Sequence, residues 1–175
     1  MIIGLSGKAG SGKDTVAKII KENTNLEVRI LAFGDAVKDI TGELLGIDRD
    51  TIERYKREDL LISGFPIRIW LQKVGTLFRN EVDPNYWIHF VLDKFQADWE
   101  HKLIIITDVR YINEAQAVKS FGGKIARINR SIEDVNTHKS EIDLDDYKSF
   151  DYIIDNTSNV LDLKNNVLEV LKDIL

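Results

Sequence analysis

The chain has 175 residues, of which 43% are hydrophobic, which is enough for one ordinary globular domain and too few for two of typical size. Its formal net charge of −5 argues against a protein that mainly binds nucleic acid polymers, because such binding needs clustered positive charge. The lack of cysteine excludes disulfides and thiolate zinc sites, and no apolar run suggests secretion or a membrane span. We therefore expect a cytoplasmic protein that holds any anionic ligand through a local basic cluster.

Five short apolar runs predict β-strands, and helical patterns of apolar residues follow most of them. The predicted strands are residues 2–6, 28–33, 103–107, 124–129 and 151–155. The predicted helices begin after the glycine-rich segment and then cover about Ala36 to Leu45, residues 115–121 and residues 160–174. Strands that alternate with helices form parallel sheets covered on both faces. The predicted fold class is therefore α/β, with three α/β/α layers around a central five-stranded parallel sheet.

Two stretches indicate more about the arrangement of the fold. The run LIIIT at residues 103–107 is expected at the centre of the sheet, since uninterrupted β-branched residues suit a strand buried on both faces. Residues from about 47 to 98 lack a predicted strand and carry helical patterns instead, so we expect a helical insertion over the strand ends. The chain as a whole, residues 1–175, is expected to be a single domain with this insertion and a short lid at about residues 130–145.

The segment GKAGSGK follows the first predicted strand and matches G-x-x-x-x-G-K, the pattern of a phosphate-binding loop. Glycines let the backbone turn so that successive N–H groups point at a phosphate, and the next helix adds the positive end of its dipole. A flexible glycine turn is the alternative, but the flanking strand and helix favour the phosphate-binding loop. The predicted phosphate-binding residues are Gly7, Lys8, Ala9, Gly10, Ser11, Gly12, Lys13, Asp14 and Thr15.

Asp14 occupies the position where this pattern usually carries the Ser or Thr whose hydroxyl binds Mg²⁺. Its carboxylate could hold the metal directly or through water, or Thr15 could take part. The alternative is structural, because an acidic side chain in the first turn of a helix complements the helix dipole. The sequence leaves these two interpretations open.

The strand at residues 103–107 ends in Thr-Asp-Val-Arg, which places Asp108 and Arg110 at the carboxyl edge of the sheet, where ligands bind in open α/β sheets. Asp108 could orient Mg²⁺ or its waters, and Arg110 could grip phosphate oxygens. The alternative is a helix N-cap followed by a surface arginine.

The insertion and the lid carry further cationic and polar candidates. Arg68 and Gln72 lie four residues apart and form a polar stripe on an otherwise apolar helix, which faces either water or a second anionic ligand. His138, in the polar segment after the fourth predicted strand, suits an ordinary loop residue or a phosphate contact better than a general base. A phosphate acceptor needs no base, because its oxygen is already anionic near neutral pH.

Six segments occur in the order found in phage-type deoxynucleoside monophosphate kinases, namely GKAGSGKDT, LAFGDAVKD, RIWLQKVGTLFRNEVDPNYW, ITDVRYINEAQAVKSFGG, THKSE and DYIIDNTSN. The chain resembles that family over almost its whole length, and the GKDT loop together with the TDVR strand end is fairly specific. The resemblance implies a P-loop NTPase fold of the NMP-kinase type, with ATP and Mg²⁺ as cofactors. It implies transfer of the γ-phosphoryl group to a deoxynucleoside monophosphate, a cytoplasmic location (that of the host for a phage protein) and a homodimer as one possible assembly.

The same resemblance implies roles for individual residues. The catalytic set would be Lys13, Arg110, Arg130 and Asp108, of which Arg130 with His138 belongs to the lid. The acceptor site would contain Asp35, Lys38, Arg68, Gln72, Arg79 and Arg110. Asp14, Thr15 and Asp108 would be the metal-binding residues.

Two competing interpretations stay open. The first is a P-loop small-molecule kinase of the dephospho-coenzyme A kinase or phosphomevalonate kinase type, whose hydroxyl acceptor would need a base, with Asp35 as the candidate. The second is a non-catalytic nucleotide-binding module. Against the second, the guanine signature N-K-x-D does not occur, and the basic residues of the insertion would have no acceptor to bind.

Overall fold

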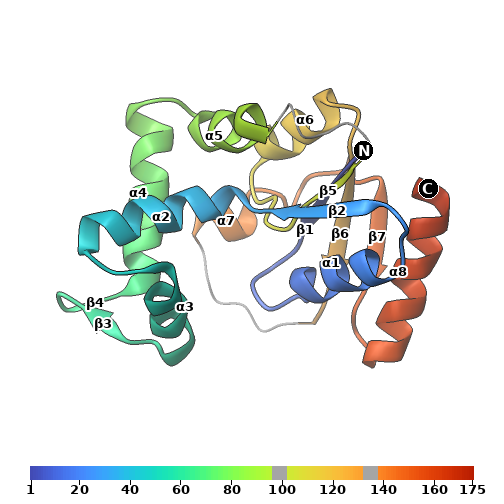
Figure 1. Ribbon diagram of the computed structural model, residues 1–175, viewed down its shortest axis with the longest axis horizontal. Coiled ribbons are helices and arrows are strands. Elements are labelled where there is room, and N and C mark those ends of the chain that lie inside the picture. Colours follow the sequence, from blue (N-terminus) through green and yellow to red (C-terminus); the bar gives the residue numbers. More distant parts are fainter. Residues whose placement is uncertain (96–101, 132–137) are drawn as a thin grey trace. The chain divides into compact units, whose positions relative to one another are not determined.

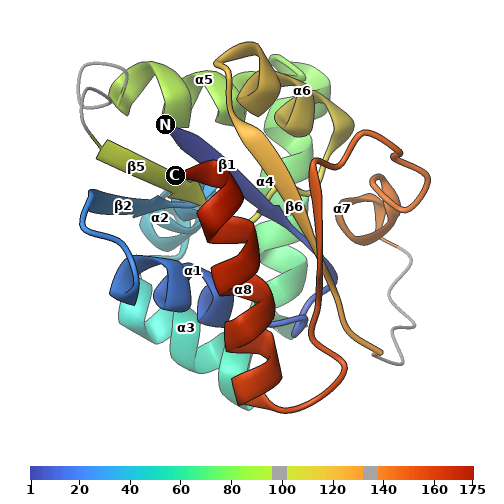
Figure 2. The same cartoon turned by 90° about the vertical axis from the view of Figure 1, so that its right-hand side faces the viewer.

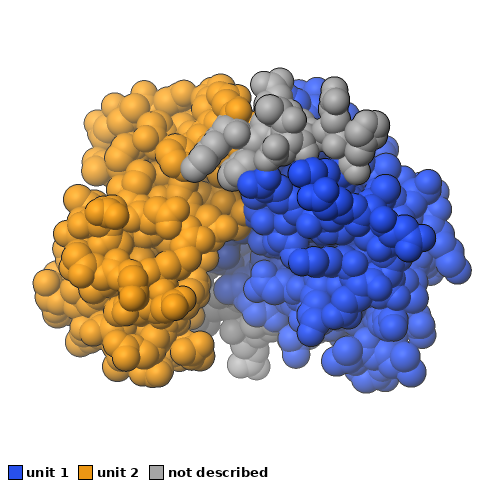
Figure 3. All heavy atoms as spheres, viewed as in Figure 1, with its two compact units in different colours: residues 1–31, 96–175 blue, residues 32–95 orange. Residues whose placement is uncertain are grey.

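The computed structural model describes residues 1–95, 102–131 and 138–175. The chain divides into two compact units, which Figure 3 colours separately. Unit 1 consists of residues 1–31 and 96–175, and unit 2 consists of residues 32–95. Within the described ranges, none of the helices has the length and apolar character needed to cross a membrane.

Unit 1 is built on a five-stranded parallel sheet with the strand order β2-β5-β1-β6-β7 (Figure 1). Its elements are β1 (Ile2–Ser6), α1 (Lys13–Glu22), β2 (Glu27–Leu31), β5 (Lys102–Ile106), α6 (Ile112–Ser120), β6 (Lys124–Asn129), α7 (Lys139–Ile142), β7 (Tyr152–Asp155) and α8 (Val160–Ile174). Because all five strands run in the same direction, the segments that follow them begin at one edge of the sheet. The predicted α/β class with its five-stranded parallel sheet is confirmed.

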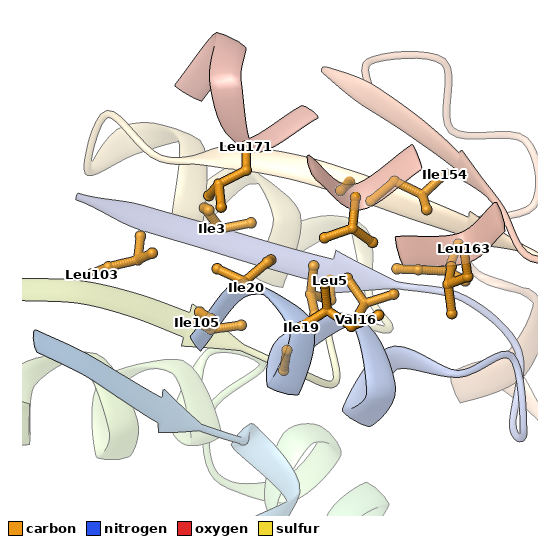
Figure 4. Close-up of a cluster of buried hydrophobic side chains, with 14 residues drawn as sticks. Ile3, Leu5, Val16, Ile19, Ile20, Leu103, Ile105, Ile154, Leu163 and Leu171 are labelled. Carbon is orange, nitrogen blue, oxygen red and sulfur yellow. The ribbon is translucent and has the colours of Figure 1, made fainter. Parts of the chain in front are cut away.

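The two faces of the sheet are covered by different helices of unit 1. Side chains alternate along a strand, so Ile3 and Leu5 of β1 face one side while Gly4 faces the other. Ile3 and Leu5 join the core that packs under α1 and α8 (Figures 2 and 4). On the opposite face α6 packs on β1 and β6, and Gly4 lets Val118 of α6 approach the sheet closely. These helices form the outer layers of a three-layer α/β/α arrangement.

The strand at the centre of the sheet is β1 rather than β5, so that sequence-based expectation is wrong. The four residues from Leu103 to Ile106 are fully buried, as the apolar run predicted. However, β5 lies between β2 and β1, and β1 is buried along its whole length as well. Burial therefore does not decide which of these two interior strands is central.

The second strand is shorter, and the helix after it begins earlier, than the apolar pattern predicted. β2 ends at Leu31, Ala32 is the extended N-cap residue, and Phe33 is the first residue of α2 (Phe33–Leu45). Phe33 is almost fully buried, so its hydrophobic character marks the packed face of a helix rather than a continuing strand. Asp35 in the first turn favours the helix, because its charge complements the helix dipole.

Unit 2 is mostly helical but contains a short β-hairpin that the sequence did not predict. Its remaining elements are α3 (Arg49–Glu58), β3 (Leu61–Ile62), β4 (Phe65–Pro66), α4 (Ile67–Glu81) and α5 (Tyr86–Phe95). The antiparallel strands β3 and β4 are joined by Ser63 and Gly64, which both have positive φ angles. Such two-residue turns form tight hairpins. Strands of two residues are too short to give a pattern that sequence reading detects.

The helices of unit 2 pack on α2, which contacts α3, α4 and α5. Trp87 of α5 is fully buried, and its indole Nε1 donates a hydrogen bond of 2.9 Å to the carbonyl of Gly75 in α4. Phe78 lies against the Trp87 ring with a centroid distance of 5.3 Å. An aromatic core thus fixes α4, the helix that carries Arg68, Gln72 and Arg79 of the predicted acceptor site, against α5.

Gly4→Ala tests the close approach of α6 to the sheet. An added Cβ would lie 2.7 Å from Ile125 Cδ1 and 2.9 Å from Val109 Cγ2, in a fully packed layer. We expect the free energy of unfolding, measured by urea denaturation, to fall by about 1–3 kcal/mol. Gly75→Ala is the matched control: its Cβ would meet only Val37 at 3.7 Å, so it should leave stability unchanged or raise it by up to about 1 kcal/mol. Equal effects of the two substitutions would contradict this packing.

Candidate phosphate-binding site

The loop between β1 and α1 turns sharply at glycines that no other residue could replace without strain. Gly12, the N-cap residue of α1, has φ 99°, and a Cβ on it would lie 2.5 Å from Nδ2 of Asn156. That same Nδ2 donates a hydrogen bond of 2.8 Å to the carbonyl of Ser11. A Cβ on Gly7 would lie 2.5 Å from the Ser11 hydroxyl. The loop is therefore closely packed against its surroundings, and its shape depends on these glycines.

The N-terminus of α1 presents backbone donors with no partner in the described part of the chain. No side chain caps this end, and the first hydrogen bond into the helix is donated by the Val16 amide to the Gly12 carbonyl. The amides of Lys13, Asp14 and Thr15 precede it and have no partner there. Unpartnered amides at a helix N-terminus favour an anion such as phosphate. The side chains of Asp14 and Thr15 are both exposed.

Lys13 is buried inside the loop, although it is a cation. Its Nζ donates hydrogen bonds of 2.6 Å to the carbonyl of Gly7 and 2.8 Å to that of Lys8. Burial, followed by the charge of Arg110, lowers the pKa of Lys13 to about 8, against the opposing influence of Asp14 and Asp108. Among the described residues, this ammonium therefore lies among carbonyl groups, and the charges of Asp14 and Asp108 do not keep its pKa at the ordinary value. A bound phosphate would supply the missing negative charge.

Arg110 is held beside the loop by Glu141, a buried residue of α7. The guanidinium of Arg110 pairs with Oε1 of Glu141, and Oε2 of Glu141 accepts a hydrogen bond of 3.0 Å from the amide of Ala9. The backbone of Arg110 is fixed separately, because its amide donates to the Glu114 carboxylate at 2.8 Å. Glu141 thus joins two predicted phosphate-binding groups that come from different segments of unit 1.

A second set of ion pairs ties the loop to the segment after α7. Lys8 donates a hydrogen bond of 2.5 Å to the Glu141 carbonyl and pairs with Asp145 at 2.6 Å. Arg127 of β6 pairs with the same Asp145 at 3.1 Å and donates to the Ser6 hydroxyl at 3.2 Å. Burial alone would raise the pKa of Asp145, but hydrogen bonds and charges from Lys8 and Arg127 hold this pKa below its usual value. Lys8 is therefore engaged within the protein itself.

The predicted lid, about residues 130–145, is only partly described, because residues 132–137 lie outside the described residues. Both lid candidates, Arg130 and His138, are described. Arg130 is exposed, and its guanidinium donates to the carbonyl of Gly10 at 3.2 Å. His138 is the N-cap of α7, and its Nδ1 accepts a hydrogen bond from the Ser140 amide. Burial and the charge of Arg110 lower the pKa of His138. A neutral imidazole suits this capping role.

Asp108 is not the N-cap residue of α6. The N-cap of α6 is Tyr111, and Glu114 accepts hydrogen bonds from the amides of Arg110 and Tyr111. Asp108 lies near enough to Lys13 for its charge to raise the pKa of Lys13. The side chains of Asp14, Thr15 and Asp108 suit Mg²⁺, which prefers oxygen ligands and is usually held by one or two carboxylates together with substrate phosphates. Among the described residues, no group of three or more acidic, histidine or cysteine side chains forms an all-protein metal cage.

The acceptor candidates of α2 form a charged network inside unit 2. Lys38 pairs with Asp35 at 3.1 Å and with Glu53 of α3 at 2.9 Å. Asp35 also pairs with Arg49 at 3.3 Å. Burial alone would lower the pKa of Lys38, but the hydrogen bonds and charges of Glu53 and Asp35 raise this pKa above the usual value. Lys38 is thus a firmly charged, partly buried cation that already has two acidic partners.

The remaining acceptor candidates lie on α4. Arg68 is exposed and donates to the carbonyl of Lys56 at 3.3 Å. Gln72 and Arg79 are partly buried. The Lys56 side chain pairs with Glu53 at 3.0 Å, so the network around Lys38 extends to the end of α3 that Arg68 contacts. Within unit 2 the structure therefore connects Asp35, Lys38 and Arg68 through α3.

Sequence reasoning missed three residues that organise these sites. Glu53 carries no signal, because a carboxylate that pairs with a distant cation looks like any surface acid. Glu141 ends the THKSE segment of the resemblance, but that resemblance assigned it no role. Asn156 directly follows β7, so the rule that ligands bind at the carboxyl ends of strands could have marked it. All three act on groups that the sequence did identify.

The fold is similar to those of solved structures, one of which is a kinase. The chain aligns with a dephospho-CoA kinase from Campylobacter jejuni at a TM-score of 0.58 and 16% identity, covering 99% of this chain and 96% of that one. It aligns with TT1252 from Thermus thermophilus at a TM-score of 0.57 and 16% identity, covering 100% and 97%. At such identities the likeness defines the fold alone. The glycine loop and Lys13 thus lie in an α/β fold that is also found in a solved kinase.

Sequence comparison identifies the family. Residues 46–167 match the family described as deoxynucleotide monophosphate kinase. The chain is also 29% identical over 184 residues to a protein of Acanthamoeba polyphaga mimivirus named "Putative deoxynucleotide monophosphate kinase", covering 96% of this chain and 94% of that protein. The chain belongs to the deoxynucleotide monophosphate kinase family.

Gly12→Ala tests whether the loop conformation is required for anion binding. The positive φ angle costs about 1–2 kcal/mol for a residue with a Cβ, and the collision with Asn156 adds to this cost. We expect affinity for inorganic tripolyphosphate, measured by calorimetry, to fall by about tenfold or more. Gly122→Ala is the control, because Gly122 also has a positive φ (73°) but has no atom within 4 Å of an added Cβ. It should lose stability but keep tripolyphosphate affinity; equal losses of affinity would contradict the assignment.

Proposed function

We propose that this protein transfers the γ-phosphoryl group of ATP to a deoxynucleoside monophosphate, giving ADP and a deoxynucleoside diphosphate. The observation that carries the proposal is the buried ammonium of Lys13, which lies in a glycine loop beside Arg110 and beside helix amides that have no partner among the described residues. Membership of the deoxynucleotide monophosphate kinase family supports the choice of acceptor. The similar fold of solved P-loop kinases agrees with phosphoryl transfer.

The proposed mechanism depends on positioning and on positive charge. Phosphoryl transfer passes through a loose transition state whose negative charge is spread over the oxygens of the transferred group. The loop amides and Lys13 would bind the phosphates of the donor, and Arg110 would stabilise the charge that develops on the transferred group. Mg²⁺, held by Asp108 with Asp14 or Thr15, would neutralise phosphate charge when bound.

The acceptor side needs orientation rather than a base. A monophosphate oxygen is ionised near neutral pH and attacks without losing a proton to the protein. Lys38, with Arg68, Gln72 and Arg79, would bind the acceptor, and Arg130 would act as a lid residue. Asp35 pairs with Lys38 and Arg49, which suits a residue that orients acceptor-binding cations.

A coupled assay of ADP release tests the proposed function directly. The acceptor panel contains the four common deoxynucleoside monophosphates, their ribose counterparts and dephospho-coenzyme A. We expect turnover with at least one deoxynucleoside monophosphate, and near-complete loss of that turnover in Lys13→Met. Asp35→Asn should keep at least part of the activity, because a phosphate acceptor needs no base. Turnover only with dephospho-coenzyme A, or none with any acceptor, would contradict the proposal.

The low pKa of Lys13 predicts that ATP binding takes up a proton at alkaline pH. In the free protein this pKa is about 8, and bound phosphates stabilise the charged form and raise it. At pH 7 Lys13 is mostly charged in both states, so it contributes little proton uptake. At pH ~9 the free ammonium is largely deprotonated, so binding should take up nearly one proton. Calorimetry of ATP binding without acceptor, in buffers of different ionisation enthalpy, measures this number.

Lys13→Arg is the matched control for the proton uptake, because a guanidinium stays charged at this pH. In this variant the uptake at pH ~9 should disappear even if affinity falls. Equal uptake in Lys13→Arg and in the unchanged protein would show that the proton binds elsewhere.

A further inference from the structure

Glu141 is a buried carboxylate with both of its oxygens engaged by predicted phosphate-binding groups. The residue is 9% exposed. Oε1 pairs with the Arg110 guanidinium, and Oε2 accepts from the Ala9 amide at 3.0 Å. Its main-chain carbonyl accepts from Lys8 at 2.5 Å. Glu141 is the last residue of the THKSE segment, and the proposed reaction gives it no role.

The segment that carries Glu141 is fixed to the loop independently of its carboxylate. The Lys8 ammonium bridges the Glu141 carbonyl and the Asp145 carboxylate, and Asp145 is held in turn by Arg127 of β6. The Glu141 carboxylate is therefore attached through the backbone to the loop and the sheet. It provides a fixed point at which the long, rotatable side chain of Arg110 can be held.

Charge explains why Arg110 needs such a partner. Its positive charge lies close enough to Lys13 to lower the pKa of that ammonium, so the two cations repel each other. The Arg110 side chain is 29% exposed and could turn toward solvent if it had no anion beside the loop. The amide of Arg110 is fixed by Glu114, but this contact does not restrain the guanidinium.

We propose that Glu141 is a positioning residue that holds the guanidinium of Arg110 against the third residue of the phosphate loop, Ala9. This inference rests on the proposed function and deepens it, because it names the residue that positions the Arg110 guanidinium near the transferred group, where negative charge develops. Glu141 acts through Arg110 and takes no part in bond making or breaking. Its loss should therefore affect turnover far more than donor binding.

The chemistry of the contact defines the informative variants. Both oxygens of Glu141 accept hydrogen bonds, whereas glutamine has one acceptor oxygen and one donor amide. Glu141→Gln can therefore satisfy either Ala9 or Arg110 but not both. Glu141→Asp keeps both acceptors and the charge on a shorter side chain, so it should restore part of the function. Glu169→Gln, on the exposed face of α8, is the matched control for the charge change.

Steady-state kinetics with the best acceptor tests the proposal. We expect Glu141→Gln to lower kcat on the order of a hundredfold while KM for ATP changes only a few-fold, since small misplacements of a charged group reduce rate by such factors. Glu141→Asp should be intermediate, and Glu169→Gln should match the unchanged protein. In an Arg110→Ala background, Glu141→Gln should change kcat by less than about threefold, because its effect passes through the missing guanidinium.

An inhibitory role for Glu141 would give a different result. A carboxylate that only occupies the place of a phosphate would compete with ATP, so Glu141→Gln would bind ATP more tightly with undiminished kcat. That outcome, or independent effects of Glu141→Gln and Arg110→Ala on kcat, would overturn the proposal.

A second measurement separates this inference from the proposed function. Four proteins are compared by urea denaturation without nucleotide: the unchanged protein, Glu141→Gln, Arg110→Ala and the double variant. This comparison reports the contact between Glu141 and Arg110 whether or not turnover is found. Non-additive losses of stability are expected, and additive losses would overturn the inference. Absence of turnover in the unchanged protein with every acceptor would contradict the proposed function but leave this test of the contact intact.

Discussion

The central constraint on this protein is the burial of the Lys13 ammonium within a tight backbone loop. Its Nζ contacts the carbonyls of Gly7 and Lys8, and burial with the nearby charge of Arg110 lowers its pKa to about 8. A buried cation is costly unless other groups compensate its charge. The glycines make such a loop sterically possible, and the carbonyl contacts satisfy the donors of Lys13. Within the part of the chain that the structure describes, the positive charge of Lys13 is thus not fully compensated, and an anion at the N-terminal amides of α1 would compensate it.

The parallel sheet explains how one site gathers groups from distant parts of the sequence. The loop after β1, the Asp108 to Arg110 segment after β5 and the Arg130 segment after β6 all begin at the same edge, because the strands run in one direction. Position at an edge does not by itself fix a long side chain. Short-range contacts do so here, through Glu141 for Arg110 and through Asp145 for Lys8 and Arg127.

The pKa of the candidate binding lysine is shifted in opposite directions in the two units. Lys13 in unit 1 has carbonyl partners and a lowered pKa, whereas Lys38 in unit 2 pairs with Asp35 and Glu53 and has a raised pKa. A phosphate that approaches Lys13 would compensate a positive charge that has carbonyl partners among the described residues. One that approaches Lys38 must exchange with, or add to, carboxylates already present. In the proposed reaction, this difference would favour strong binding of the donor phosphates and leave selection of the acceptor to a network that can rearrange.

The sequence by itself determined the five-stranded α/β fold, the phosphate-loop pattern and the segments that the parallel sheet brings to one edge. These follow from local patterns: apolar runs, glycine spacing and residues at strand ends. The tertiary structure alone decided that β1 rather than β5 is central, because neighbour order depends on crossover connections and not on burial. It also decided that Phe33 begins a helix, that residues 61–66 form a hairpin, and that Glu141, Glu53 and Asn156 contact the predicted site residues. Such contacts join residues far apart in the chain, and nothing in their local sequence marks the partner that each will meet.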